Sequence, residues 1–342
     1  MEVTLLSFLE EVLKEQDGGF LFRFPNQNGE DKIVYWENHL EANVGSKNKD
    51  RVARDEWILT NRQSLYNVVF EQRYPREGLV GHYKVYYRGV SDVAYKNTPG
   101  IYRQGEKHDE NYYYNEIQVQ CPTSFERMGH INKLTYMQHY GCPTRLLDIT
   151  TNPLVALYFA CQGSEDKDGA VYLFCENNSE ILYEQSDKVQ ILSKLSEFDQ
   201  FEQREMLLLS YRNILKGKYP QLTNGKYSDP IIEKLYHAIK RDNPAFEREL
   251  VPLDLLKPYF VQTHKDNPRL LKQDGAFIIS GLNYDELECN FKLEPKTKRK
   301  IVVPAKCKKN ILKQLAGIGV TKATLFPEID KVAEYLKSND GF

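Results

Sequence analysis

The segment 133–161 constrains the fold more than any other part of the sequence, because it holds helix stop and start signals in a fixed order. The spacing of its first apolar residues predicts a short helix over 133–140. Gly141 and Pro143 end that helix, since glycine suits a left-handed C-terminal residue and proline cannot continue a helix. The sequence therefore predicts a turn at this point, followed by extended backbone.

An extended segment is predicted over 144–151, and a second helix follows it. Asn152 and Pro153 open this helix, as its N-cap and first-turn residue. The apolar stripe of the helix consists of Leu154, Leu157, Tyr158 and Cys161. Because the helix surface is nearly all apolar, we expect the helix to be buried.

The extended segment is notable for its polar side chains, which are Thr144, Arg145, Asp148, Thr150 and Thr151. A strand that runs into a helix N-terminus places its last side chains where backbone N–H groups point outward, and such a position binds anions. The alternative is structural: these groups cap the helices and pair among themselves, Arg145 with Asp148, and so fix the loop. Both interpretations stay open at this point.

Composition excludes several classes of protein. The chain has 342 residues and a net charge of −2, so attraction to nucleic acid or membrane can only be local. Its six cysteines form no Cys-x-x-Cys pair and no Cys/His cluster with zinc-ligand spacing, and we expect no metal. The first apolar run contains acids, unlike a secretory signal, and no run approaches the ~18 apolar residues of a membrane helix. The sequence predicts a reduced, cytoplasmic protein without membrane attachment.

Residues 1–79 are expected to form an N-terminal α/β cap region, and residues 80–342 the main domain. Apolar residues at helical spacing predict a helix over 3–16. Alternating residues predict two strands within 20–36, and a second helix is predicted over 56–73.

Aromatic and β-branched residues predict a strand over 83–90, which ends with Arg88 and Gly89. An arginine at a strand end can reach a phosphate with its planar fork, while the glycine lets the backbone turn sharply. The turn at 97–103 supplies a second arginine, Arg103. The alternative for Arg88 is a structural pairing with a buried aspartate.

The later part of the chain again places polar residues beside buried strands. Residues 178–245 are mostly helical and charged, and we interpret them as a helical insertion. Gln273 and Asp274 lead into a strand predicted over 276–280, after a turn and a short helical piece. Further predicted elements are strands over 169–175 and 300–303, a helix over 309–316, an extended piece over 321–326 and a terminal helix over 330–337.

The strongest basic run of the chain covers 292–313. It is either a solvated surface or a docking surface for nucleic acid, in which contacts with phosphates supply the affinity. In the second case the candidate contact residues are Lys298, Arg299, Lys300, Lys308 and Lys309.

His139 and Cys142 lie three residues apart at the predicted helix end. His139 is either a site residue or a core histidine bonded to a backbone carbonyl. A thiol nucleophile at Cys142 would make the protein a cysteine-based hydrolase. Packing is the better explanation of a cysteine that precedes proline at a helix end.

Together these pieces resemble the FRG-domain proteins, a family named for a Phe/Tyr-Arg-Gly motif. The most specific piece is QHYGCPTRLLD, from Gln138 to Asp148. The resemblance covers about 80–335 and excludes 1–79 and the middle helices. Its other pieces, in order, are Tyr87-Arg88-Gly89, Pro99-Gly100-Ile101-Tyr102-Arg103, residues 151–160, Arg269, Gln273-x-Gly275-x-Phe277 and Leu325-Phe326-Pro327.

The chain also resembles ADP-ribosyltransferases of the arginine-serine-glutamate type. Arg88 with Gly89 corresponds to their strand arginine, and Ile149-Thr150-Thr151 to their Ser-Thr-Ser strand, which runs into a helix. The resemblance implies that NAD is bound as a substrate, with Arg88 near its phosphates and ribose and the hydroxyl strand supporting the nicotinamide pocket. The remaining candidate cofactor-binding residues are Gly89, Arg103, Thr144, Arg145, Asp148, Thr150 and Thr151.

The chain departs from the transferase pattern where the family glutamate opens a later strand. Gln273 and Asp274 occupy this position. In the family a carboxylate there holds a ribose hydroxyl and stabilises the positive charge that grows as nicotinamide leaves, and glutamine supplies no charge. Either catalysis is weak, another carboxylate serves, or the site binds without transfer. The candidate catalytic residues are Arg88, Gln273, Asp274 and His139.

We therefore expect an α+β protein with a mixed sheet core similar to that of ADP-ribosyltransferases, to which the N-terminal cap and the helical insertion are added. The expected function is NAD-dependent ADP-ribosyl transfer to a macromolecule, either nucleic acid such as RNA or protein. A role as a bacterial toxin or phage-defence effector, with an antitoxin partner, rests on analogy alone. The alternative is a non-catalytic module that binds a nucleotide or nucleic acid.

Overall fold

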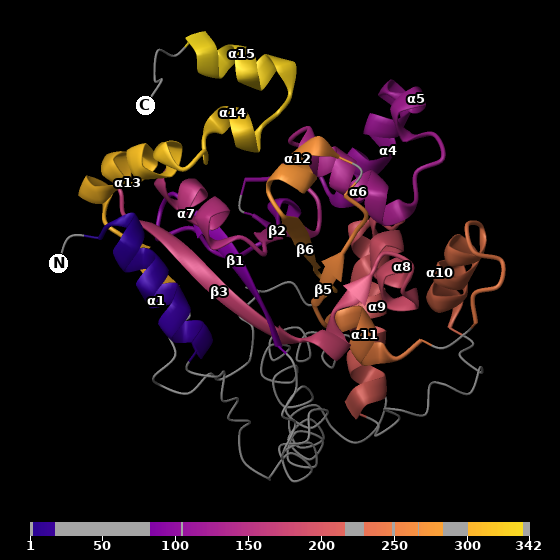
Figure 1. Ribbon diagram of the computed structural model, residues 1–342. Coiled ribbons are helices and arrows are strands. Elements are labelled where there is room, and N and C mark those ends of the chain that lie inside the picture. The colour runs from indigo at the N-terminus through magenta and orange to yellow at the C-terminus, as the bar shows by residue number, and fades with distance from the viewer. Residues whose placement is uncertain are drawn as a thin grey trace.

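A seven-stranded mixed sheet forms the centre of the protein in the computed structural model, which describes residues 3–17, 83–103, 105–215, 229–247, 250–265, 267–282 and 300–337 (Figure 1). The strands are β1 (Tyr83–Val90), β2 (Leu146–Thr150), β3 (Gly169–Asn177), β4 (Leu182–Tyr183), β5 (Tyr259–Gln262), β6 (Gly275–Ile279) and β7 (Lys300–Val303). Their order across the sheet is β4-β5-β6-β2-β1-β3-β7. Only β4 and β5 are parallel within this sheet, so the described part of the chain is an α+β fold.

The sheet is nearly divided in two between β1 and β2. These strands share one residue pair, Tyr87 with Thr150, whereas β1 pairs with β3 along its whole length. Arg88 bridges the gap, because its Nη1 donates to the carbonyl oxygen of Asp148 at 2.7 Å. A side chain here completes the hydrogen bonding that a continuous ladder would otherwise supply.

Helices α1 (Leu5–Asp17), α7 (Pro153–Cys161) and α13 (Ala305–Gly317) pack beside β1, β3 and β7 (Figure 1). A Cβ atom on Gly89 would lie 1.8 Å from the carbonyl oxygen of Ala156, so only glycine allows α7 to approach β1 this closely. Phe8 and Val12 of α1 are buried in the same apolar cluster. Helix α1 is therefore part of the main core and not a separate cap.

The other half of the sheet packs against a larger group of helices, and Leu146, Phe277 and Ile279 are buried beneath them. Because the segment after β3 supplies both β4 and several of these helices, the described residues of 178–245 share the core. The helices are α4 (Glu110–Gln120), α6 (His130–His139), α8 (Asp187–Lys194), α9 (Gln200–Leu215), α10 (Pro230–Lys240) and α11 (Pro252–Leu256).

A third apolar cluster lies on the opposite face of the sheet and joins its two halves. Since successive side chains of a strand alternate between faces, Tyr86 faces away from its neighbour Tyr87, and Leu147 faces away from Leu146. The cluster also contains Ile149, Phe174, Phe260 and Ile278.

Most of the predicted elements are confirmed, including β1, β2, α7 and the terminal helix α15 (Ile329–Lys337). Helix α6 begins three residues before the predicted start. The extended piece predicted over 321–326 is wrong, because Thr321 and Thr324 form a capping box that starts helix α14 (Lys322–Leu325). The strands and helix predicted within 20–73 lie outside the described residues. No helix among the residues described has the length and apolar character needed to cross a membrane.

Candidate functional site

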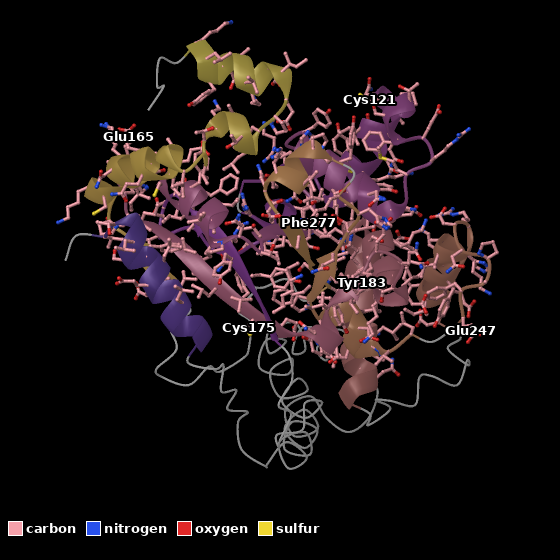
Figure 2. The ribbon with its side chains drawn as sticks, in the orientation of Figure 1. Cys121, Glu165, Cys175, Tyr183, Glu247 and Phe277 are labelled. Atoms are coloured by element: carbon pink, nitrogen blue, oxygen red, sulfur yellow. The ribbon has the colours of Figure 1, made fainter. Side chains whose placement is uncertain are left out.

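A pocket of about 520 Å³ lies between α6 and the short helix α12 (Pro268–Lys272). Its volume is within the ~300–1,000 Å³ range of small-molecule sites. Asp148 of β2 and Phe277 of β6 line it from the sheet, and they are opposite each other in the strand register. Figure 2 labels Phe277, which lies near the centre of the molecule, below α12 in this view. The further lining residues used below are Arg127, Tyr136, Gln138, His139, Tyr140, Arg269, Gln273 and Glu328.

The turn after α6 gives the first wall of the pocket its shape. Gly141 has φ = +85°, as predicted for a left-handed C-terminal residue, and the N–H of Cys142 donates to the carbonyl of Met137 at 3.0 Å. Thr144 donates its hydroxyl hydrogen to Oε1 of Gln138 at 2.5 Å. Thr144 is buried, so it fixes the turn and does not itself line the pocket.

His139, in the last turn of α6, pairs with a carboxylate that the sequence did not suggest. Its Nε2 lies 3.3 Å from Oε1 of Glu328. Burial, and then the nearby charge of Arg269, lower the pKa of His139 below its usual value, although Glu328 opposes this shift. His139 is therefore neutral at neutral pH. The second oxygen of Glu328, Oε2, is buried and has no hydrogen-bond partner among the described residues.

Arg269 supplies positive charge to the opposite wall. Its guanidinium carbon lies 4.7 Å from the centre of the Phe326 ring, and Nη1 donates to the carbonyl of His139 at 3.5 Å. A planar guanidinium stacked in this way keeps its other N–H groups in a fixed direction. Arg127, with φ = +60°, is a second and exposed arginine in the lining.

Gln273 and Asp274 have different surroundings, although they are neighbours. Gln273 lines the pocket, and its Nε2 donates to the carbonyl of Leu325 at 3.1 Å. Asp274 has φ = +46°, and its carboxylate accepts from Asn152 at 3.2 Å and from Lys265 at 3.3 Å. Asp274 thus ties the α12–β6 turn to the start of α7 and is not a lining residue.

The hydroxyl groups of Thr150 and Thr151 bind backbone carbonyls of the same turn, between α12 and β6. Thr150 donates to the carbonyl of Gln273 at 2.7 Å, and Thr151 to that of Asp274 at 3.4 Å. Thr150 also accepts from the N–H of Asn152 at 3.0 Å. In this structure both residues hold β2, β6 and α7 together, and neither lines the pocket.

Arg88 contacts the pocket only indirectly, because its guanidinium binds the backbone carbonyl of the lining residue Asp148. Burial lowers the pKa of Arg88 to about 10, so the guanidinium stays charged at neutral pH. Its Nε is buried without a hydrogen-bond partner among the described residues. Arg103 is exposed and donates from Nε to the carbonyl of Thr98 at 3.1 Å. Neither arginine lines the pocket.

Arg145 is fully buried, and its partner is Glu110 rather than the predicted Asp148. Nε lies 2.6 Å from Oε2 of Glu110, and the backbone N–H donates to Oε1 at 2.7 Å. Nη2 donates to Gln203 at 3.1 Å. Burial alone would lower the pKa of Arg145, but the Glu110 carboxylate raises it. Arg145 therefore fixes β2 on α4 and cannot reach a ligand.

Cys142 does not have the properties of a nucleophile. The side chain is half-buried and packs against the core that surrounds α6. Burial raises the pKa of its thiol to about 11, so little thiolate exists at neutral pH.

The basic residues of the C-terminal part do not form one exposed surface. Lys308 is buried, and its Nζ donates to the carbonyls of Ser91 and Ser164 at 2.7 and 2.9 Å. The prediction that it contacts nucleic acid is therefore wrong. Lys309 is exposed and pairs with Glu165, which Figure 2 labels beside α13. Lys300 is exposed, with Nζ 5.3 Å from the Tyr172 ring centre, and Lys298 and Arg299 lie outside the described residues.

Residues 83–169 match the family model of the FRG domain. The matched segment includes β1, α6, β2 and α7, and with them Gln138, His139 and Asp148 of the pocket. No curated protein and no solved structure matches the chain.

Sequence reasoning placed His139, Asp148 and Gln273 at the site, and all three line the pocket. It did not select Arg269 or Glu328. Arg269 belongs to one of the motif pieces, and Glu328 directly follows another, Leu325-Phe326-Pro327. The signal for both residues was therefore their position beside motif pieces that are far apart in the chain.

Proposed function

We propose that the pocket between α6 and α12 binds NAD and that the protein transfers its ADP-ribosyl group to a macromolecule. One observation carries the proposal: motif pieces from three distant parts of the chain, at 138–148, 269–277 and 327, all line this one pocket. Side chains that come together from such distances only on folding are better explained by a shared ligand than by local structure.

The charged side chains of the lining also favour a nucleotide that carries both negative and positive charge. Arg269 and Arg127 supply cationic groups for a diphosphate, for which a guanidinium fork is well suited. Tyr136 and Tyr140 offer ring surfaces for a planar base or nicotinamide. Glu328 brings negative charge to the same space, which suits the positive charge on the nicotinamide ring of NAD.

The near division of the sheet beside Arg88 supports the same proposal. Arg88 holds the pocket edge of β2 through Asp148, and its guanidinium stays charged in a partly buried position. A role for Arg88 in transfer is therefore indirect: it positions the strand that lines the pocket.

The test is a comparison of Arg269→Gln with Lys272→Gln. Lys272 is exposed on the same helix and does not line the pocket, so it is the matched control. We expect the wild-type protein and Lys272→Gln to bind NAD in a calorimetric titration and to label material in cell lysate with radioactive NAD. Arg269→Gln should bind NAD at least ~10-fold more weakly, because it loses a charge-assisted contact with the diphosphate. Equal NAD affinity in Arg269→Gln and wild type would contradict the site.

A non-catalytic nucleotide-binding module is the second candidate, and the environment of Gln273 favours it. The position that a transferase would use for a carboxylate holds an amide, which is bonded to the carbonyl of Leu325. NAD binding without release of nicotinamide or labelling of lysate would select this candidate. Nuclease and protease treatment of any labelled material would separate a nucleic acid acceptor from a protein acceptor.

A further inference from the structure

We propose that Glu328 is the catalytic carboxylate of this pocket and that His139 is the residue that positions it. The inference rests on the proposed function, since it names the group that stabilises the transition state of NAD cleavage. The catalytic carboxylate then lies in the segment between α14 and α15, and not at the start of β6, where Gln273 and Asp274 are.

The surroundings of the Glu328 carboxylate are the first observation. One carboxylate oxygen lies 3.3 Å from Nε2 of His139, and the other is buried with no partner among the described residues. A buried, unpaired carboxylate oxygen is costly to the free energy of folding, and native structures rarely retain one without a reason. Glu328 lines the pocket, and a ligand that draws the carboxylate toward itself would supply the partner that this oxygen lacks.

The position of the other acids is the second observation. Asp148 and Glu328 are the carboxylates among the described residues that line the pocket. Asp148 is exposed, so water screens its charge. Asp274 is engaged by Asn152 and Lys265 outside the lining. Of the two carboxylates that line the pocket, Glu328 is therefore the one whose charge is less screened by water.

The segment that carries Glu328 is fixed on both sides. Phe326 packs under the guanidinium of Arg269, and its ring centre lies 6.0 Å from that of Phe159 in an edge-to-face contact. The amide of Gln273 holds the carbonyl of Leu325. These contacts give the Glu328 backbone a defined place, and His139 then fixes the direction of the carboxylate.

The reaction requires the bond between ribose C1′ and the nicotinamide nitrogen to break. The electron pair of that bond leaves with neutral nicotinamide, and C1′ becomes oxocarbenium-like. The negative charge of the Glu328 carboxylate stabilises this positive charge. A lone pair of the acceptor, or of water in NAD hydrolysis, then forms the new bond to C1′, and the proton of that acceptor passes to the Glu328 carboxylate and on to solvent.

The test compares Glu328→Gln with Asp330→Asn, a charge removal two residues along on the exposed surface of α15. We expect Glu328→Gln to keep its NAD affinity within about threefold in a calorimetric titration. Its rate of nicotinamide release should fall at least ~100-fold, the scale of losing one preorganised electrostatic group. Asp330→Asn should match the wild type in both measurements. If Glu328→Gln impairs folding, Glu328→Asp provides the same test, with unchanged affinity and an intermediate loss of rate.

His139 has a test that a merely structural role would not satisfy. His139→Gln keeps an N–H donor and should retain most of the turnover, whereas His139→Leu should lower kcat at least ~10-fold with KM nearly unchanged. Nicotinamide release by Glu328→Gln at the wild-type rate would overturn the inference while leaving NAD binding intact. Failure of the wild-type protein to bind NAD would instead overturn the proposed function and this inference with it.

Discussion

The variant Glu110→Ala distinguishes a structural Arg145 from a ligand-binding one. Arg145 is fully buried and Glu110 is 2% exposed, so the pair has almost no contact with water. Both oxygens of Glu110 are used, one by the guanidinium and one by the backbone N–H of Arg145. The substitution leaves a buried cation without its counter-charge and a buried N–H without an acceptor.

The expected loss of stability follows from these two contacts. Removing one partner of a buried ion pair costs about 3–5 kcal/mol, and a buried N–H without a partner costs about 1–3 kcal/mol. The two terms share one residue and overlap in part, so we expect Glu110→Ala to lower the free energy of unfolding by about 4–6 kcal/mol. Gln203 retains its contact with Nη2 and limits the loss.

Urea unfolding followed by circular dichroism is the assay, and the slope of the free energy against urea should stay constant. Glu116→Gln, on an exposed position of the same helix, is the control and should change the stability by less than about 0.5 kcal/mol. Replacing both Glu110 and Arg145 by methionine should restore part of the loss, since no charge is then left unpaired. If Glu110→Ala costs less than about 1 kcal/mol while NAD affinity collapses, Arg145 contacts the ligand and the structural assignment is refuted.

Two further predictions concern packing and pH. Gly89→Ala should destabilise the protein by about 3 kcal/mol or more in the same unfolding assay, because the new methyl group meets the backbone oxygen of Ala156 and not a flexible side chain; a variant as stable as wild type would mean that α7 is not held against β1. Burial lowers the pKa of His130 to about 4, beside Lys194, Glu197 and Asp242. The unfolded state therefore binds the proton first, and stability should fall as the pH drops from about 6.5 to 4, by up to about 3 kcal/mol. His130→Gln should remove much of this pH dependence, and an unchanged slope would contradict the assignment.

Local signals in the sequence predicted the elements around the pocket well. Gly141, Asn152 and Pro153 each act through their own backbone conformation or that of a near neighbour, so the end of α6 and the start of α7 could be placed from sequence alone. The same holds for β1, whose length follows from composition. The capping box that starts at Thr321 was missed because its third helical residue is Thr324, where Glu or Gln is usual.

Partners that are distant in the chain could not be predicted in this way. Arg145 and Glu110 are 35 positions apart, and Asp148 was the nearer and more obvious acid. Lys308 belongs to a basic run, but the tertiary fold turns it inward against backbone carbonyls. Its neighbour Lys309 stays exposed, as adjacent residues of a helix face different directions. Such choices depend on how elements pack, which no local pattern contains.

The pocket has two walls, and only one of them belongs to the matched FRG segment. Residues 83–169 supply the end of α6 and the strand β2, while α12, β6 and the segment with Glu328 come from 267–328. The walls meet through the His139–Glu328 pair and through the hydroxyl of Thr150, which holds the carbonyl of Gln273. Both of these contacts use a motif residue from within the matched segment. The matched segment alone would therefore lack Arg269, Phe277 and Glu328 of the second wall, so the pocket extends at least as far along the chain as Glu328.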